Sequence, residues 1–334
     1  MPRRPRRRRR AGAGAPARLV LLALLAAAGL GGGAAPPPSP PQGVRLHVSA
    51  DRQAARAAAA APAAGSAAEA DALDVLAAQP TAVWLGSWLS PQRAADRTRE
   101  VVAAAAAGGT VPVLVLYALP HRDCGGWSAG GSADAASYRA WSAAVAGALG
   151  PQRAVVVLEP DSLGQLDCLD GAARAERYAL LRGAVRELTA HPATLVYLDG
   201  GHSDWLPAEE AAARLRRAGV AGARGFATNV SNARSTADEV AWGLRVSALT
   251  GGARFVVDTS RNGRGPATGG DPWCNPPGRA LGRPPLSARP APEVDALLWV
   301  KAPGESDGDC GRGEPAAGRF WPAYAVGLVQ RRAW

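Results

Sequence analysis

Several residue types are scarce in this chain of 334 residues, and their scarcity narrows the possible functions. There is no isoleucine, a single lysine (Lys301), one methionine and three phenylalanines, whereas Ala, Arg, Gly and Pro are abundant. This skew indicates codon bias, so the rare residue types are more informative than any single Ala or Arg. The dinucleotide-binding GxGxxG, P-loop and HExxH motifs are also missing, and we expect neither a cofactor nor a bound metal.

Most of the net positive charge of the chain lies at the N-terminus. Eight of the 38 basic residues lie among the first 18 positions, and no acidic residue precedes Asp51. Without those eight, 30 basic residues stand against 28 acidic ones, so the rest of the chain is nearly neutral. A protein that binds nucleic acid or a membrane surface usually carries an excess of basic residues in its folded domain. We therefore expect no nucleic-acid partner, unless the Arg-rich N-terminus is retained.

The N-terminus is typical of an export signal. Residues 1–10 are polybasic, Leu19 to Leu30 form an apolar segment too short for a comfortable membrane span, and small residues follow at 31–35. We predict a signal peptide over residues 1–35, a Pro-rich linker over 36–43 and one folded domain over 44–334. Arg-Arg pairs leave a twin-arginine route open, and an uncleaved anchor is the alternative. After cleavage we expect a secreted, extracellular protein with no stable membrane partner.

From Val44 onward, short apolar runs alternate with longer Ala-rich stretches, a pattern typical of repeated β-α units. The predicted strands are Val83–Gly86, Val113–Tyr117, Val155–Glu159, Leu195–Asp199, Gly225–Asn229, Arg254–Asp258 and Ala296–Lys301. The predicted helices are Gln53–Ala64, Gln92–Ala107, Ala133–Leu149, Gly171–Ala190, Ala208–Ala218, Thr236–Leu249 and Trp321–Arg332, with Thr236 and Glu239 as a capping box. Such units form a parallel barrel or a doubly wound sheet. Seven strands favour a distorted, incompletely closed β/α barrel similar to a TIM barrel.

The segment from Ala154 to Leu163, AVVVLEPDSL, is an apolar run that stops at carboxylates. Pro160 ends the strand, and Asp161 then lies just past its carboxyl end, where α/β proteins place their chemistry. The alternative is that Asp161 only caps the next helix. Most other predicted strands also end at polar or aromatic residues, which converge on one face if the strands are parallel. That convergence favours a functional cleft.

The four cysteines follow neighbouring predicted strands in two sequential pairs. Parallel neighbours would bring each pair together at one end of the barrel, so we predict disulfides Cys124–Cys168 and Cys274–Cys310. A zinc site is the alternative, but no CxxC pair is present to support it.

Seven segments together resemble glycoside hydrolase family 6, the inverting endoglucanases and cellobiohydrolases that cleave β-1,4-glucan. They occur in the order of the family and span nearly everything after the linker. The segments are LYALPHRDC (Leu116 to Cys124), LEPDSL (Leu158 to Leu163), YLDGGHSDW (Tyr197 to Trp205), GFATNVSN (Gly225 to Asn232), VVDTSRNGRGP (Val256 to Pro266), PWCNPPGRALG (Pro272 to Gly282) and LLWVKAPGESDG (Leu298 to Gly308). The resemblance implies a distorted seven-stranded β/α barrel, in agreement with the strand count.

The resemblance also implies roles for three aspartates. Inversion needs an acid that protonates the leaving oxygen and a base that activates water on the opposite face of the sugar. Asp161 would be the acid, and Asp123 would raise its pKa and help relay a proton. Asp307 would be the base, with Asp309 or a water relay to Asp123 as rivals. Glu159 is expected to be structural.

Substrate-binding roles follow from the same resemblance and from residue chemistry. The predicted substrate-binding residues are Tyr117, Asp199, Trp84, Trp205, Asn229, Trp273, Lys301 and Glu305. Tryptophan rings offer flat platforms to sugars, and the single lysine offers a compact ammonium to a sugar hydroxyl.

The predicted function is therefore a secreted, monomeric endo-β-1,4-glucanase. The alternatives are an exo-acting cellobiohydrolase of the same family and a non-catalytic glucan-binding protein. Internal cutting is favoured because two loops that could roof the site are short: Asp161 lies ten residues before Gly171, and nine residues separate Cys310 from Phe320. The one longer candidate is the Pro-rich segment from Pro276 to Pro292, whose stiffness suits a wall better than a closing lid.

Overall fold

The computed structural model describes residues 44–64, 67–286 and 288–334. The predicted signal peptide and linker lie outside these residues. Seven parallel strands form one sheet in which every strand pairs with its neighbour in sequence. The strands are β1 (Val83–Gly86), β2 (Val113–Tyr117), β3 (Ala154–Leu158), β4 (Thr194–Asp199), β5 (Gly225–Thr228), β6 (Arg254–Asp258) and β7 (Val294–Leu298). The predicted fold class is confirmed.

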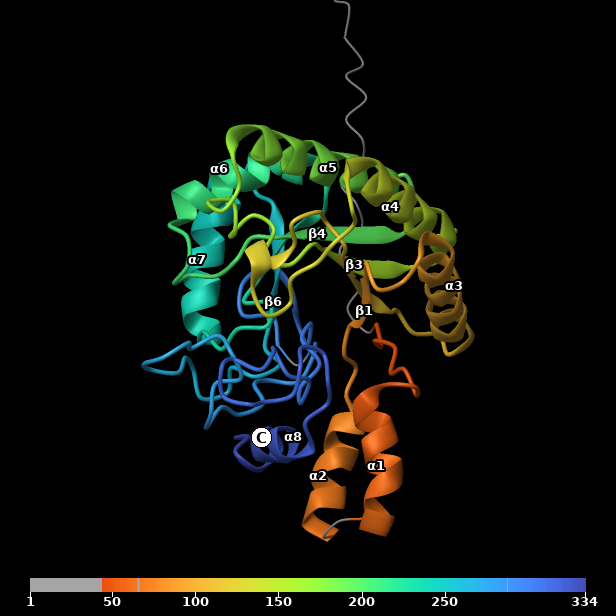
Figure 1. Ribbon diagram of the computed structural model, residues 1–334, viewed down its shortest axis with the longest axis vertical. Helices are drawn as coiled ribbons and strands as arrows, with labels where there is room; N and C mark the ends of the chain where they lie inside the picture. The colour runs from red at the N-terminus through yellow and green to blue at the C-terminus, as the bar shows by residue number, and fades with distance from the viewer. Residues whose placement is uncertain (1–43, 65–66, 287) are drawn as a thin grey trace, which may run out of the picture. The chain divides into compact units, whose positions relative to one another are not determined.

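The α-helices that connect successive strands from β1 to β6 cover the outer side of the curled sheet (Figure 1). The helices are α1 (Gln53–Ala64), α2 (Ala67–Ala78), α3 (Pro91–Ala107), α4 (Ala135–Leu149), α5 (Gly171–Thr189), α6 (Ala208–Ala218), α7 (Thr236–Leu249) and α8 (Pro322–Gln330), with short 3₁₀ turns at Asp123–Gly125 and Val220–Gly222. Helix α2 is the one of these eight α-helices that the sequence did not predict.

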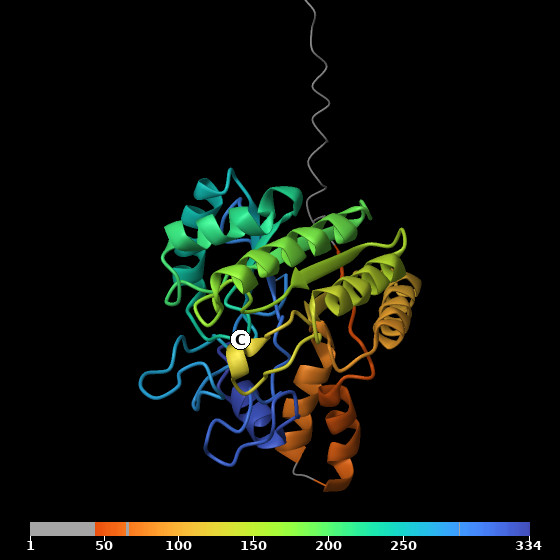
Figure 2. The same ribbon diagram turned by 45° about the horizontal axis from the view of Figure 1, so that its top comes forward.

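The strands are apolar on both faces because each face meets packed side chains. Alternate residues of β2 and β3, such as Leu114 and Val156, pack against the surrounding helices. The intervening residues, such as Val115 and Val157, fill a second cluster inside the curl of the sheet. This two-sided burial explains why the strands appear in the sequence as continuous apolar runs. Figure 2 shows the helices lying along the strands from a second direction.

The sheet does not close, and its two edge strands meet at a seam. No ladder joins β1 to β7. Instead, the backbone N–H of Ala82 donates to the carbonyl of Trp299 at 3.0 Å, and the indole N–H of Trp84 donates to the carbonyl of Val300 at 2.9 Å. This arrangement is the incompletely closed barrel predicted from the strand count.

Helices from the two ends of the domain pack together below the seam. Leu73 and Leu76 of α2 lie in one buried cluster with Tyr324 and Leu328 of α8 and with Trp299. The three helices α1, α2 and α8 lie side by side in Figure 1. Within the described residues, no helix is long and apolar enough to cross a membrane.

The start of α7 differs from the predicted capping box. Ser235 is the N-cap, and its hydroxyl accepts the backbone N–H of Asp238 at 3.1 Å. Glu239 is fully buried and instead accepts the backbone N–H of Ser203 at 3.0 Å and the hydroxyl of Thr228. Adjacent Ser and Thr both suit an N-cap, so the pattern alone placed the cap one residue too late.

Candidate active site

Backbone conformations of positive φ gather where the strands end. Ten non-glycine residues in the described part of the chain have positive φ, and all but Leu286 lie in loops near the carboxyl ends of strands. They are His121, Asp123, Cys124, Glu159, Asp161, Asn229, Ser231, Asn275 and Cys310. Such conformations carry a free-energy cost and persist where the surroundings enforce them, often at functional sites. Their concentration at the strand ends indicates a candidate functional site there.

Asp161 follows β3 directly and lies partly exposed on the wall of a cleft. Its backbone N–H donates to the carboxylate of Asp199 at 2.9 Å, which fixes the turn after the strand. Burial and the negative charges of Asp123 and Asp307 raise the pKa of Asp161 to about 7, although Lys301 opposes the rise. A carboxyl group with this pKa retains its proton in weakly acidic solution and can act as a general acid.

Asp307, in the loop after β7, has the opposite environment. The side chain of Asp307 is only 8% exposed and pairs with Arg261 at 2.5 Å and with Lys301 at 3.0 Å. Burial alone would raise its pKa, but the charges of Arg261 and Lys301 more than offset burial and hold the pKa below its usual range. The two aspartates thus differ in the way that a proton donor and a proton acceptor must.

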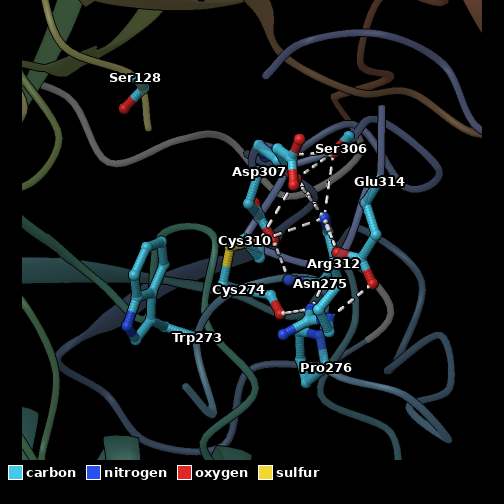
Figure 3. Close-up of a disulfide and its surroundings, with 12 residues drawn as sticks. Ser128, Trp273, Cys274, Asn275, Pro276, Ser306, Asp307, Cys310, Arg312 and Glu314 are labelled. Carbon is cyan, nitrogen blue, oxygen red and sulfur yellow. Dashed lines mark hydrogen bonds and ion pairs between the residues drawn. A yellow bond between two sulfur atoms is a disulfide. The ribbon is translucent and has the colours of Figure 1, made fainter. Parts of the chain in front are cut away.

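The Cys274–Cys310 disulfide holds the loop of Asp307 in place (Figure 3). Asn275, next to this disulfide, donates its backbone N–H to the carboxylate of Asp307 at 2.8 Å. Its side-chain oxygen accepts the backbone N–H of Asp307 at 2.7 Å. The same side chain donates to Glu314 at 2.8 Å. This reciprocal pair fixes both the backbone and the carboxylate of Asp307.

Lys301 is positioned by a buried carboxylate. Asp258, at the end of β6, accepts the backbone N–H groups of Val300, Lys301, Ser231 and Ser260 at 2.9–3.2 Å. It therefore ties the carboxyl ends of β5, β6 and β7 together. The ammonium of Lys301 then reaches the carboxylate of Asp307 at 3.0 Å.

Asp123 lies in the loop after β2, at the start of a short 3₁₀ turn. Its carboxylate accepts the backbone N–H and the hydroxyl of Ser128 at 2.7 and 2.9 Å and the side-chain amide of Gln165 at 2.8 Å. The hydroxyls of Ser128 and Tyr117 lie 2.9 Å apart. Asp123 therefore belongs to a polar network that joins the β2 loop to the loop of Asp161.

Ser128 is not among the residues predicted from the sequence, although residues 126–130 fit the GxSxG pattern of serine hydrolases. In those enzymes the serine lies on a sharp turn between a strand and a helix and is paired with a histidine. Here Ser128 lies in an irregular loop, and its hydroxyl contacts Asp123 and Tyr117. The geometry does not support a serine nucleophile.

Glu159 has the structural role that the sequence predicted. It is 1% exposed, and its carboxylate accepts the backbone N–H of Ala118 at 2.9 Å and that of Leu119 at 3.1 Å. Burial raises its pKa to about 7, although these hydrogen bonds oppose the rise. Glu159 thereby fastens the end of β2 to the end of β3, and with them the loops of Asp123 and Asp161.

A cleft of about 1420 Å³ lies over the seam and the strand ends. This volume exceeds that of a typical pocket for a small ligand and suits a polymer. Nine of the eleven predicted catalytic and substrate-binding residues line it, namely Asp123, Asp161, Asp307, Tyr117, Trp84, Trp205, Trp273, Lys301 and Glu305. Asp309, the rival to Asp307, is not among the lining residues; its carboxylate accepts the backbone N–H of Gly313 at 2.8 Å in a local turn.

Asp199 and Asn229 correct the sequence prediction, because both are buried and neither lines the cleft. Asp199 is 1% exposed and points at the backbone of Asp161. Burial and the charge of Asp161 raise the pKa of Asp199. Asn229 donates to the carbonyl of Asp258 at 2.8 Å and accepts the backbone N–H of Arg234 at 3.0 Å. Both residues hold the backbone of the loops that form the site.

Several cleft residues were not predicted as binding or catalytic residues. Trp88 and Trp127 are 59% and 47% exposed and line the cleft. Arg261 was not predicted either; it is not among the lining residues, but it is almost fully buried and forms the ion pair with Asp307 described above. His202 also lines the cleft, and burial with the nearby Arg234 lowers its pKa to about 4, so it is neutral near pH 7. An excess of tryptophan is visible in the sequence, but it does not show which rings are exposed.

The loop after β2 touches the loop after β7. Gly308 has a φ of +147°, and a Cβ placed on it would lie 2.4 Å from Cβ of Trp127. Only glycine fits at this point. The loops that carry Asp123 and Asp307 are thus in contact across the seam.

Both predicted disulfides are present. Cys124–Cys168 joins the loops after β2 and β3, and Cys274–Cys310 joins the loops after β6 and β7. Each bond lies beside a cleft aspartate. The pairing is the one that parallel neighbouring strands predict.

Comparison with known proteins identifies the family. The sequence pattern of "Glycosyl hydrolases family 6" matches residues 41–332. The chain belongs to this family. Among curated members, the chain is 46% identical to "Endoglucanase 1" of Streptomyces sp. (strain KSM-9) over 76% of this chain and 70% of that protein. It is 42% identical to "Endoglucanase A" of Cellulomonas fimi over 78% of this chain, a match that spans about half (56%) of that protein's length.

A solved family 6 structure shares the fold closely. The endoglucanase Cel6 from Mycobacterium tuberculosis, in complex with methyl-cellobiosyl-4-deoxy-4-thio-β-D-cellobioside, has a TM-score of 0.85 and 46% sequence identity to this chain. The match covers 88% of this chain and 99% of that one. A second family 6 structure, the cellobiohydrolase Cel6A from Chaetomium thermophilum, has a TM-score of 0.76 at 25% identity. Bacterial endoglucanases are thus more similar to this chain than that cellobiohydrolase is.

Proposed function

We propose that this protein is an endo-β-1,4-glucanase that hydrolyses internal bonds of cellulose or related β-glucans with inversion at the anomeric carbon. The single observation that carries the proposal is the contrast between Asp161, whose pKa is raised to about 7, and Asp307, whose pKa is held low by Arg261 and Lys301. Both line one cleft. The endoglucanase names of the bacterial relatives support the same substrate.

In the proposed reaction, Asp161 protonates the glycosidic oxygen as the bond to the anomeric carbon breaks. Water attacks the opposite face of the sugar and loses a proton to Asp307 as base. Each turnover thus leaves Asp161 deprotonated and Asp307 protonated, and both reset by exchange with solvent. Asp123 keeps negative charge near Asp161 and so favours its protonated form. With Ser128, Asp123 also offers an alternative path for the proton of the attacking water.

Three of the predicted tryptophans line the cleft: Trp84 on β1, Trp205 in the loop after β4 and Trp273 in the loop after β6. We infer that their rings bind the faces of glucosyl units on the two sides of the cleavage point. Tyr117 lies beside Trp84, with ring centroids 5.3 Å apart, and its hydroxyl lies 2.9 Å from that of Ser128. Lys301 and Glu305 supply charged groups for sugar hydroxyls on the β7 side.

Internal cutting is proposed because the segments that follow Asp161 and Cys310 are short, and because the longer Pro-rich segment over 276–292 suits a wall better than a closing lid. Helix α5 begins at Gly171, ten residues after Asp161, and α8 begins at Pro322, soon after Cys310. We further propose that the protein is exported and monomeric, with β-1,4-glucan as its partner. Two disulfides favour an oxidising compartment.

The test is the anomeric form of the product. Cellopentaose hydrolysis followed by proton NMR from the first seconds should show α-anomers appearing first, before mutarotation. Initial β-anomers would exclude inversion, and no hydrolysis would exclude the enzyme. On carboxymethyl-cellulose, viscosity should fall well before reducing ends accumulate; a release of cellobiose with little loss of viscosity would indicate exo action.

A further inference from the structure

One wall of the cleft carries a row of flat side chains that ends at Trp88. The rings of Trp84 and Tyr117 meet edge to face, with centroids 5.3 Å apart. The guanidinium of Arg122 lies 4.5 Å from the centre of the Tyr117 ring and 5.6 Å from that of Trp88. All four residues line the cleft. The row therefore continues past Tyr117 to a ring that the proposed mechanism does not use.

Hydrogen bonds hold Arg122, the link in this row, in one position. Its guanidinium donates to the carbonyls of Tyr117 and Ser128 at 2.9 and 2.8 Å. It also donates to the hydroxyl of Ser87 at 3.2 Å. Because the guanidinium is fixed, it gives the Trp88 ring a defined neighbour on one face.

The turn after β1 is also shaped around Trp88. A Cβ on Gly86 would lie 2.1–2.5 Å from three atoms along the benzo edge of the Trp88 ring. Glycine at this position therefore allows the ring to fold back against the end of β1. The ring is placed by its contacts with Gly86 and Arg122 rather than by burial.

Trp88 nevertheless remains 59% exposed, which is more than a packing role requires. Four tryptophans in the described part of the chain are exposed: Trp88, Trp127, Trp273 and Trp334. The first three line the cleft. An exposed apolar ring that is continuous with a binding cleft marks a contact with a ligand.

We propose that Trp88 forms an additional glucosyl-binding subsite at the far end of the row from Trp84, on the β1 side of the cleft. This inference rests on the proposed function, since its occupant is a further unit of the same β-1,4-glucan chain. The negative face of an aromatic ring attracts the positively polarised C–H groups on the face of a pyranose. Trp88 therefore gives the cleft a preference for longer chains.

The experiment compares ligands of two lengths in a chain that binds but does not cleave. Binding of cellotriose and cellohexaose is measured by calorimetry in the Asp161→Asn background, with and without Trp88→Ala. Loss of Trp88 should weaken cellohexaose binding about tenfold, the scale of one lost ring contact, and change cellotriose binding less than twofold. Trp88→Phe, which keeps a ring, should retain most of the affinity for cellohexaose.

Trp334→Ala is the matched control, because Trp334 is 44% exposed but does not line the cleft. It should leave the binding of both ligands unchanged. An unchanged affinity for cellohexaose in Trp88→Ala, or equal weakening of both ligands, would overturn the proposed subsite. Activity of the wild-type protein is measured separately on carboxymethyl-cellulose. Hydrolysis without a dependence on Trp88 refutes only the subsite, and Trp88-dependent binding without hydrolysis refutes only the proposed activity.

Discussion

The substitution Asp123→Asn tests how the general acid is tuned. Asparagine has nearly the shape of aspartate and can still accept the hydrogen bonds of Ser128, and Gln165 can offer its amide oxygen after a flip. The substitution therefore removes a charge and leaves the network intact. In the wild type, burial and then the charge of Asp123 raise the pKa of Asp161 to about 7.

Asp161 must be protonated to act, so activity falls as pH rises through its pKa. Removing one nearby negative charge should lower that pKa and move the basic limb of the pH profile toward acid by about one pH unit. The acidic limb should move less, since the pKa of Asp307 is held low by Arg261 and Lys301. Initial rates on carboxymethyl-cellulose between about pH 4 and pH 9 measure both limbs.

Asp204→Asn provides the matched control. Asp204 also lines the cleft, but it pairs with Arg234 at 2.9 Å and is not among the charges that raise the pKa of Asp161. The basic limb of the pH profile of Asp204→Asn should coincide with that of the wild type. A basic limb that stays in place in Asp123→Asn, or moves equally in Asp204→Asn, would refute the assignment of Asp123 as the group that tunes Asp161.

Three further outcomes are expected. Asp161→Ala should lower turnover on unactivated β-glucan at least about a hundredfold while cellohexaose binding persists; wild-type turnover in the folded variant would remove Asp161 from the mechanism. Glu159→Gln should lower the free energy of unfolding by about 1–3 kcal/mol in urea titrations, because the amide NH₂ group would take the place of Oε1, which accepts the backbone N–H of Ala118 at 3.1 Å, and a donor cannot accept that hydrogen bond. An unchanged midpoint would show that these hydrogen bonds contribute nothing. Replacing Cys274 and Cys310 together by serine should lower the free energy of unfolding by up to about 4 kcal/mol, because the disulfide closes a loop of 36 residues. The same variant should also lose activity, because the disulfide holds the loop that carries Asp307. Full activity at wild-type stability would contradict both effects.

The strands and the aspartates could be predicted because their signals are local. Most strands are short apolar runs that end at or just before a polar or aromatic residue, and two-sided burial makes such runs conspicuous in the sequence. Asp161 follows its strand directly, so parallel topology alone brings it to the edge where chemistry takes place. The cysteines could be paired for the same reason.

The burial of Asp199 and the partner of Asp307 could not be predicted in this way. Asp199 is the last residue of β4, and whether its side chain enters the cleft or turns to a neighbouring backbone depends on the path of the next loop. Arg261 lies 46 residues before Asp307. It lies in the segment VVDTSRNGRGP, but in a chain with abundant arginine the sequence does not show that this one pairs with Asp307. Helix α2 lacks a clear amphipathic pattern because half of its residues are alanine and it packs against both α1 and α8.

The seam between β1 and β7 joins parts of the chain that the ribosome makes early with parts that it makes late. Gln53, at the start of α1, donates to Glu305 across 252 positions and accepts the backbone N–H of Phe320 across 267. The proposed acid and base likewise come from distant parts of the chain. Contacts between such distant residues form late in folding, because a long stretch of chain must first be closed. A nascent chain emerging from the ribosome can complete the first six strands and still lack Lys301, Asp307 and the second disulfide. The enzyme thus remains without a functional catalytic centre until its final segment docks against its first.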